Sequence, residues 1–350
     1  MTMLDAAGTI RHIRYRLATR RRAVTLALCA LLALTFAVAL YLGDYDVPPG
    51  EVLRSLLSPL TGLTDKGIDF IVLNVRLPRA TLAVLSGIAF ALSGIIFQTL
   101  LRNPLASPDI IGISHGASAS AVFCIIVLGL SGAGVSLGAL AGAVLTALVI
   151  YALSWRGGVT AYRVVLIGIG MAAMMAAIMS YLFTRARIFE VQKALGWLIG
   201  SLNASSSSDV IGLAIAIAIL LPATVLLVRA LDAMQLGDDT AAALGARVEA
   251  VRLGLMLVAV AYAAFATAAV GPVTFVAFVA GPIARNLLAG SGKGFVQAAL
   301  VGALVMLGSD LLAQHALPAV QLPVGVVTGV FGAGFLLWLL IVSNRAGQVN

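Results

Sequence analysis

Long apolar stretches separated by short polar segments dominate the pattern of this chain. Because a helix rises about 1.5 Å per residue, a stretch of about 20 residues can cross the hydrocarbon core of a membrane. The pattern predicts ten membrane-spanning helices, at residues 23–42, 80–101, 113–130, 136–154, 164–183, 210–228, 253–270, 272–288, 295–317 and 324–342. These stretches are about twice as long as the strands of membrane barrels, so we expect an all-α fold.

Two polar connections are long enough to contain structure of their own. Residues 43–79 are rich in proline, and we expect an external loop there with a short helix near 51–57. Residues 184–209 are predicted to form a second external segment, with a short helix around 191–199.

A third polar connection, residues 229–252, is amphipathic. Asp238 and Asp239 precede a run of alanines, where carboxylates can accept from the unpaired N–H groups at a helix N-terminus. Gly237 and Gly245 punctuate the segment and predict two short helices. Since one predicted span precedes the segment and another follows it, the segment could transmit the movement of a partner protein to both spans.

The span predicted at 80–101 carries small residues on one helix face. Gly87 and Gly94, each preceded by a serine, are seven residues apart, and Gln98 lies on the same face. Small residues allow neighbouring backbones to approach closely, and an amide within a membrane needs a hydrogen-bond partner. We therefore expect this face to meet protein or a water-filled path.

Composition supports a membrane protein throughout the chain. Hydrophobic residues make up 61% of it and charged residues only 10%, against about 25% charged residues in soluble domains. We expect a single transmembrane domain over residues 1–350. The net charge of +8 could suggest a nucleic-acid partner, but the arginines of residues 1–22 directly precede a span. Such a basic tail is typical of a cytoplasmic terminus beside anionic lipid, so we expect contact with lipid and no nucleic-acid binding.

The distribution of basic residues predicts the orientation. With a cytoplasmic N-terminus, about two thirds of the lysines and arginines fall on the inner side, as the positive-inside rule requires. Ten spans then return both termini to the cytoplasm. Arg76 and Arg79 fall on the outer side, against the bias. Pro78 is expected to begin a helix from which both guanidinium groups project.

Several motifs together resemble a known family. The string RLPR at 76–79, the two Ser-Gly pairs, Gln98 and the string RNPLA at 102–106 are similar to permeases of ATP-driven importers for iron chelates and cobalamin. Within that family, the chain is most similar to ferric enterobactin permeases. The likeness recurs at residues 168–170, 196–202, 236–245, 271–285 and 322–328. The resemblance implies the fold of a type II ABC importer permease.

The resemblance also implies docking sites for partners. Arg76 and Arg79 would receive carboxylates of an extracytoplasmic substrate-binding protein, which suits guanidinium geometry. Residues 229–252 would be the cytoplasmic coupling helices that fit the ATP-binding subunit. The residues that match the family's coupling pattern are Leu236, Gly237, Asp238, Asp239, Ala243, Leu244 and Gly245.

The resemblance also implies which residues form the translocation path and its cytoplasmic gates. The matching positions are Gln98, Asn103, Pro104, Leu105, Thr160, Ala161 and Tyr162. This chain departs from the family pattern at Gln314, where relatives can have a third arginine, and at Gly281-Pro282, where proline and histidine are common.

The resemblance implies a transport subunit rather than an enzyme, in the cytoplasmic (inner) membrane of a bacterium. Expected partners are a second permease, either a copy of this chain or a homologous one, and two ATP-binding subunits that hold ATP and Mg. Residues 290–294 resemble a phosphate-binding loop but lack its first glycine and its final serine or threonine. The three histidines lack ligand spacing, so we expect neither a cofactor nor a metal site on this chain.

A secondary transporter driven by an ion gradient is the alternative. Such carriers commonly use ionisable groups in the middle of a span. Asp310 is the one acidic residue within the predicted spans, and it lies toward the outer end of its span. The sequence therefore favours the ATP-driven importer.

Overall fold

A computed structural model describes residues 3–43, 45–62, 65–156, 159–234, 237–243, 245, 247–290, 292–317 and 320–347. Within them the regular structure is helical, with one isolated bridge and no strand, as the pattern of apolar stretches predicts. The helices are α1 (Met3–Tyr41), α2 (Pro49–Thr61), α3 (Lys66–Asp69), the π-helix η1 (Phe70–Arg76), α4 (Leu77–Leu100), α5 (Ile113–Ile126), α6 (Ala133–Ser154), α7 (Ala161–Arg185), α8 (Ile188–Leu198), α9 (Ser207–Met234), α10 (Asp238–Ala243), α11 (Val248–Val270), α12 (Val276–Leu288), α13 (Phe295–His315) and α14 (Val324–Gly347).

Ten apolar helices correspond one for one to the ten predicted spans. In the described part of the chain, seven are long and apolar enough to cross a membrane. The other three, α5, α12 and the first part of α14, are apolar but shorter. The short helices predicted in the two external segments are also present, as α2 and α8. The chain is therefore an all-α, multi-pass membrane protein.

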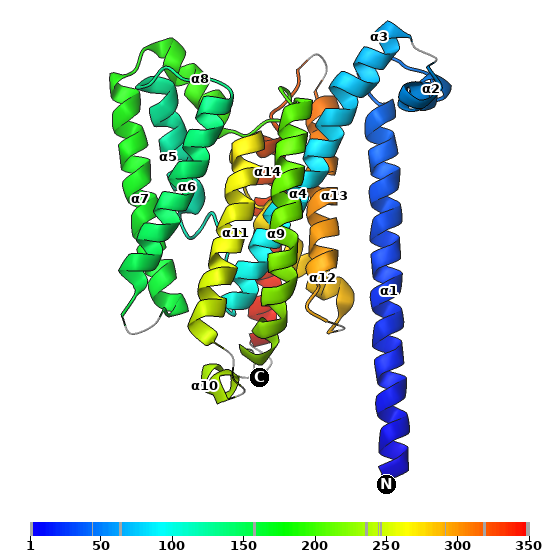
Figure 1. Cartoon of the computed structure of the whole chain (residues 1–350), viewed down its shortest axis with the longest axis vertical. Helices are drawn as coiled ribbons and strands as arrows, with labels where there is room; N and C mark the ends of the chain where they lie inside the picture. Colours follow the sequence, from blue (N-terminus) through cyan, green and yellow to red (C-terminus); the bar gives the residue numbers. More distant parts are fainter. Residues whose placement is uncertain are drawn as a thin grey trace.

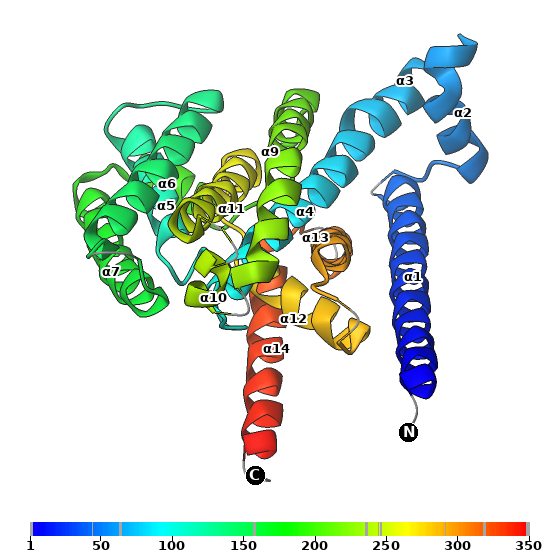
Figure 2. The same ribbon diagram turned by 60° about the horizontal axis from the view of Figure 1, so that its bottom comes forward.

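Helix α4 lies at the centre of the bundle and packs against α9, α11, α12 and α13. Figure 1 shows α5, α6 and α7 on one side of it and α1 on the other. In Figure 2, α1 and the C-terminal part of α14 stand away from the rest of the bundle.

The small-residue face of α4 allows this central position. A Cβ atom added at Gly94 would lie 1.8 Å from the carbonyl oxygen of Ala277 in α12. One added at Gly87 would lie 2.4 Å from the carbonyl oxygen of Gly302 in α13. Ser93 donates a hydrogen bond to Ala259 in α11. The prediction that this face meets protein is confirmed.

The second span begins earlier than predicted. Asp65 caps α3 by accepting from the N–H groups of Gly67 and Ile68, and the helix then continues through η1 into α4. Pro78 does not begin it, because the π-helical turn before the proline keeps the chain helical: Leu77 donates to the carbonyl of Val72, five residues back.

The third and eighth spans are shorter than predicted, since turns replace their ends. Helix α5 begins at Ile113 as predicted but ends at Ile126, because residues 127–130 form a turn and irregular structure. Gly271 and Phe275 both have positive φ angles, and they separate α11 from α12. Gly271 also allows a close approach, because its added Cβ would lie 2.8 Å from the carbonyl oxygen of Trp197 at the end of α8.

The described residues of the amphipathic segment 229–252 form one short helix rather than the two expected. Helix α9 extends to Met234 and α11 begins at Val248, and α10 is the one helix described between them. Leu236 and Leu244 lie outside the described residues. The residues of the predicted basic tail are helical from Met3, and α1 continues without a break into the first span.

Candidate functional site

The ends of α1, α4 and α13 that are predicted to face outward meet around Arg76 and Arg79. Arg76 is 8% exposed, and Nη1 of its guanidinium group donates to the carbonyl oxygens of Leu40 and Tyr41 at 2.9 and 2.8 Å. Nη2 donates to the carbonyl oxygen of Tyr45. Arg76 therefore does not project from the protein as expected. It fixes the end of α1 against the second span.

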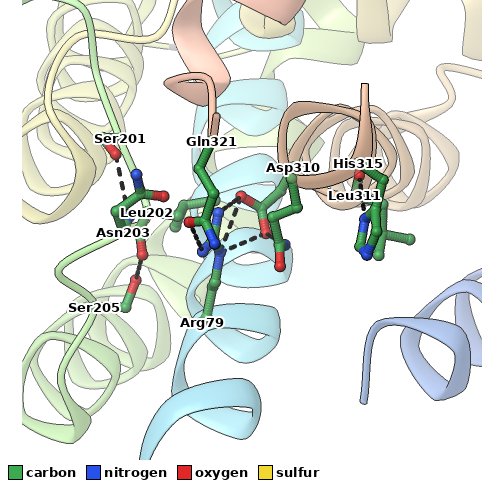
Figure 3. A network of polar contacts seen from close by, with 10 residues as sticks. Arg79, Ser201, Leu202, Asn203, Ser205, Asp310, Leu311, His315 and Gln321 are labelled. Atoms are coloured by element: carbon green, nitrogen blue, oxygen red, sulfur yellow. Dashed lines mark hydrogen bonds and ion pairs between the residues drawn. The ribbon is translucent and has the colours of Figure 1, made fainter. Parts of the chain in front are cut away.

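Arg79 makes a different set of contacts, shown in Figure 3. Its Nε and Nη2 atoms donate to the carboxylate of Asp310 in α13, and Nη2 lies 2.9 Å from Oδ1. Gln314 donates to the same carboxylate at 2.8 Å. Nη1 of Arg79 donates to Oε1 of Gln321 at 3.3 Å. Asp310, 231 residues away in sequence, was missed as a partner because no local pattern connects it with Arg79.

A cavity of about 180 Å³ lies at this outer end. Both arginines, Asp310, Gln314 and Gln321 contribute to its wall, together with apolar residues of α1 and η1. Gln314 thus stands where relatives can have a third arginine, and its amide donates a hydrogen bond to the Asp310 carboxylate.

The inner end of α4 carries three of the residues predicted at the path and gates. Gln98 donates to the carbonyl oxygen of Phe278 at 2.9 Å and accepts from Arg285 at 2.7 Å, so its amide joins α4 to α12. Gln98, Asn103 and Pro104 line one cavity of about 300 Å³, together with Arg285 and Lys293. These three predicted residues therefore lie together at the end of α4 opposite Arg79.

The second predicted gate begins α7, at a neighbouring cavity. Thr160 precedes the helix and lines a space of about 220 Å³, together with residues of α9 and α11. Tyr162 is exposed, and Leu105 in the first gate segment is half-buried. The side chain of Ala161 lies outside the described part of the chain.

Two arginines connect these gate segments to the helices around α10. Arg102, next to Asn103, donates to the carbonyl oxygen of Met234 at the end of α9. Arg252, in the first turns of α11, donates to the carbonyl oxygen of Val159 at 2.9 Å, directly before Thr160. The sequence indicated no role for either residue, because each acts on a carbonyl group far away in the chain.

Helix α10 is bounded by two glycines that sequence analysis singled out. Gly237 and Gly245 have φ angles of 109° and 86°, which favour glycine. Ala241 faces inward and is fully buried, whereas Ala243 is exposed. The side chains of Asp238 and Asp239, in the first turn, lie outside the described set.

The chain is similar to known proteins over most of its length. The model of the FecCD transport family matches residues 31–342. The chain is 39% identical to the ferric enterobactin transport system permease protein of Escherichia coli (strain K12), covering 93% of this chain and 98% of that protein. It is 38% identical to the achromobactin transport system permease protein of Dickeya dadantii (strain 3937), covering 91% and 90%.

A solved structure shares the fold. It is described as an inward-facing conformation of a putative metal-chelate type ABC transporter, and it matches with a TM-score of 0.79 at 22% identity, covering 91% of this chain and 99% of that one. The fold is therefore that of a type II ABC importer permease. Since the family model spans most of the chain and the relatives match over nearly their whole length, this chain belongs to the FecCD transport family.

Proposed function

We propose that this chain is the permease subunit of an ATP-driven importer that carries an iron-siderophore complex across the bacterial cytoplasmic membrane. The observation that carries the proposal is the pair of hydrogen bonds from Arg102 and Arg252, which join the helices around α10 to both gate segments. The substrate class is proposed from the relatives, which include permeases named for ferric enterobactin, achromobactin and Fe(3+) dicitrate.

Two ATP-binding subunits dock on residues 229–252 and hold ATP and Mg. This chain binds no cofactor and catalyses no chemical reaction itself. Movement of α10 in that complex pulls on α9 and α11, between which it lies. The carbonyl of Met234 then moves Arg102 and the Asn103 segment, and Arg252 moves the Thr160 segment. Packed elements with two discrete arrangements transmit such small shifts.

The translocation path runs between two permeases, which are either two copies of this chain or this chain and a homologue. Helices α7 and α14 support this arrangement, because both expose large apolar side chains, including Tyr162, Ile169, Phe331 and Trp338. The remaining exposed apolar surface faces lipid. Both termini lie in the cytoplasm, and the binding protein delivers its cargo at the outer end of α4, around Arg76 and Arg79.

Affinity purification of the tagged complex from membranes tests the proposal. The intact chain is expected to retain an ATP-binding subunit, and Asp238→Arg/Asp239→Arg to lose it because the docking surface reverses its charge. Asp46→Arg, in an exposed position on the outer side, is the control and should retain the subunit. Mass spectrometry of the retained proteins also distinguishes identical from different permeases. Equal retention by all three forms would contradict docking at α10.

The ion-driven alternative can be separated by its energy source. Asp310, the acidic residue that could have served a proton-coupled carrier, is paired with Arg79 near the outer end of α13. Uptake of radioactive iron chelate into proteoliposomes should require ATP and survive an uncoupler. Uptake that stops with the uncoupler while ATP is present would favour the ion-driven carrier.

A further inference from the structure

The two edges of the Arg79 guanidinium group face different surroundings (Figure 3). One edge, formed by Nε and Nη2, holds the carboxylate of Asp310 at distances of 3.2, 3.0 and 2.9 Å. The remaining nitrogen, Nη1, donates to Oε1 of Gln321 at 3.3 Å. A guanidinium group is planar and has five N–H donors, so a carboxylate on one edge still allows an acceptor on another.

These two contacts differ in strength. The Asp310 side chain is 3% exposed, and Gln314 donates a further hydrogen bond to its carboxylate. A buried, charge-assisted pair with two parallel hydrogen bonds holds its geometry firmly. The bond to Gln321 is longer, joins the cation to a neutral amide and is exposed. Arg79 is therefore fixed through Nε and Nη2, which hold Asp310, and can exchange the acceptor that Nη1 contacts.

We propose that Asp310 positions Arg79 as a receptor for one carboxylate of the extracytoplasmic binding protein, and that Oε1 of Gln321 occupies the place which this carboxylate takes. The inference rests on the docking that is part of the proposed function. A carboxylate is a stronger acceptor than an amide for a cationic donor, so the exchange favours the docked state. Asp310 is a positioning residue, whereas Arg79 makes the contact.

The surroundings of Arg79 decide which kind of ligand fits. The cavity beside it measures about 180 Å³, smaller than the pockets of about 300 to 1,000 Å³ that hold drug-sized molecules. It can therefore admit an acidic side chain but not a whole iron chelate. Arg76 does not provide a second receptor of the same kind, because its guanidinium group is buried against the carbonyl groups at the end of α1.

The first test places a carboxylate on the chain itself. In Gln321→Glu the new carboxylate would accept from Nη1 of Arg79 and repel the carboxylate of the binding protein. Binding of the extracytoplasmic protein that co-purifies with the complex, measured on complexes in nanodiscs, should weaken about tenfold or more. Gln192→Glu, an exposed position on the outer helix α8, makes the same chemical change away from Arg79 and should leave binding within about twofold.

The second test separates positioning from general damage to the structure. Asp310→Asn keeps the shape of the side chain but removes its charge, and binding should fall about tenfold while ATP-binding subunits stay attached. In an Arg79→Gln background, Gln321→Glu and Asp310→Asn should have no further effect on binding, since both act through the guanidinium group. Full and additive losses in that background would overturn the inference.

The outcomes also distinguish this inference from the proposed function. If the intact complex binds the extracytoplasmic protein and Gln321→Glu binds it equally well, the receptor at Arg79 is wrong while the importer stands. If the intact complex binds no extracytoplasmic protein, the docking proposal fails and the inference fails with it.

Discussion

At the scale of single residues, Arg76 and Arg79 illustrate how one motif supplies two functions. Their spacing of three puts them on neighbouring parts of one helix face, as the sequence predicts. Two different helices meet that face, however. Arg76 reaches the carbonyl groups at the end of α1, and Arg79 reaches the carboxylate of Asp310 in α13. The spacing therefore fixes where the side chains start, and the neighbouring helices decide what they do.

The first prediction concerns Arg76. In Arg76→Gln, the buried carbonyl group of Leu40 and the part-buried carbonyl groups of Tyr41 and Tyr45 lose a charged donor, and unfolding should become easier by about 2 to 4 kcal/mol. The thermal midpoint of the purified protein in detergent measures this loss. Arg54→Gln is the control, because within the described residues Arg54 pairs with Glu51 one turn away and is exposed. If both variants melt alike, Arg76 does not fix α1.

The second prediction concerns close packing at α4. Gly94→Ala places a methyl group 1.8 Å from the carbonyl oxygen of Ala277, so α4 and α12 must separate. Overpacking of this kind costs about 1 to 3 kcal/mol or more, which lowers the thermal midpoint by roughly 3 to 10 °C. Gly212→Ala in α9 is the matched control, since nothing lies within 4 Å of its added Cβ. An unchanged midpoint for Gly94→Ala would mean that the helices repack without cost.

Residue patterns reveal the glycine contacts but not the ion pair. Gly87 and Gly94 repeat at a helical period, so their shared face is visible in the sequence, and only the identity of the helices opposite is not. Asp310 forms a pair with a residue 231 positions away. Periodicity gives no information about such a pair, because it depends on which helices become neighbours.

At the scale of elements, the number of helices follows from the sequence more reliably than their limits. All ten spans are present, yet α5 and α12 begin or end in turns that the apolar pattern conceals. Val273 lies in the turn before α12 and is almost completely buried. An apolar residue in a buried turn looks the same in sequence as one in a span, so composition predicts burial but not helical geometry.

The third prediction concerns the two hydrogen bonds that join the predicted gate segments to α9 and α11, the helices on either side of α10. Arg102→Gln/Arg252→Gln removes the charged donors that bind the carbonyl oxygens of Met234 and Val159. Coupling energies between sites are typically about 1 to 3 kcal/mol, so uptake should fall by roughly 5- to 150-fold. ATP hydrolysis by the assembled complex should stay within about twofold, because the proposed ATP sites are in other subunits.

Arg22→Gln provides the control for this double variant, since Arg22 is exposed on α1 and lies outside the docking segment 229–252. It should leave both uptake and hydrolysis unchanged in proteoliposomes. Parallel loss of uptake and hydrolysis in the double variant would indicate failed assembly rather than lost coupling.

At the scale of the whole molecule, α1 and α14 differ from the central helices. Only 6% of the most apolar window of α1 is buried within the chain, against 78% for the helix that includes α4. The described part of α14 likewise exposes large apolar side chains such as Phe331 and Trp338. In a membrane protein such surfaces contact lipid or another subunit, and neither contact is visible in the pattern of a single sequence. The sequence therefore predicts the internal core better than the outer surfaces.

The fourth prediction concerns the orientation of the whole chain in the membrane. If the positive-inside rule holds, Asn203 lies outside, between α8 and α9, and Ala242 lies inside, on α10. Both are exposed. A background with Cys29→Ser and Cys124→Ser removes the native thiols. In intact cells a membrane-impermeant maleimide should label Asn203→Cys, while Ala242→Cys should react only after the membrane is opened. The opposite pattern would invert every assignment made above: α10 would face away from ATP, and Arg79 would face a compartment that contains no extracytoplasmic binding protein.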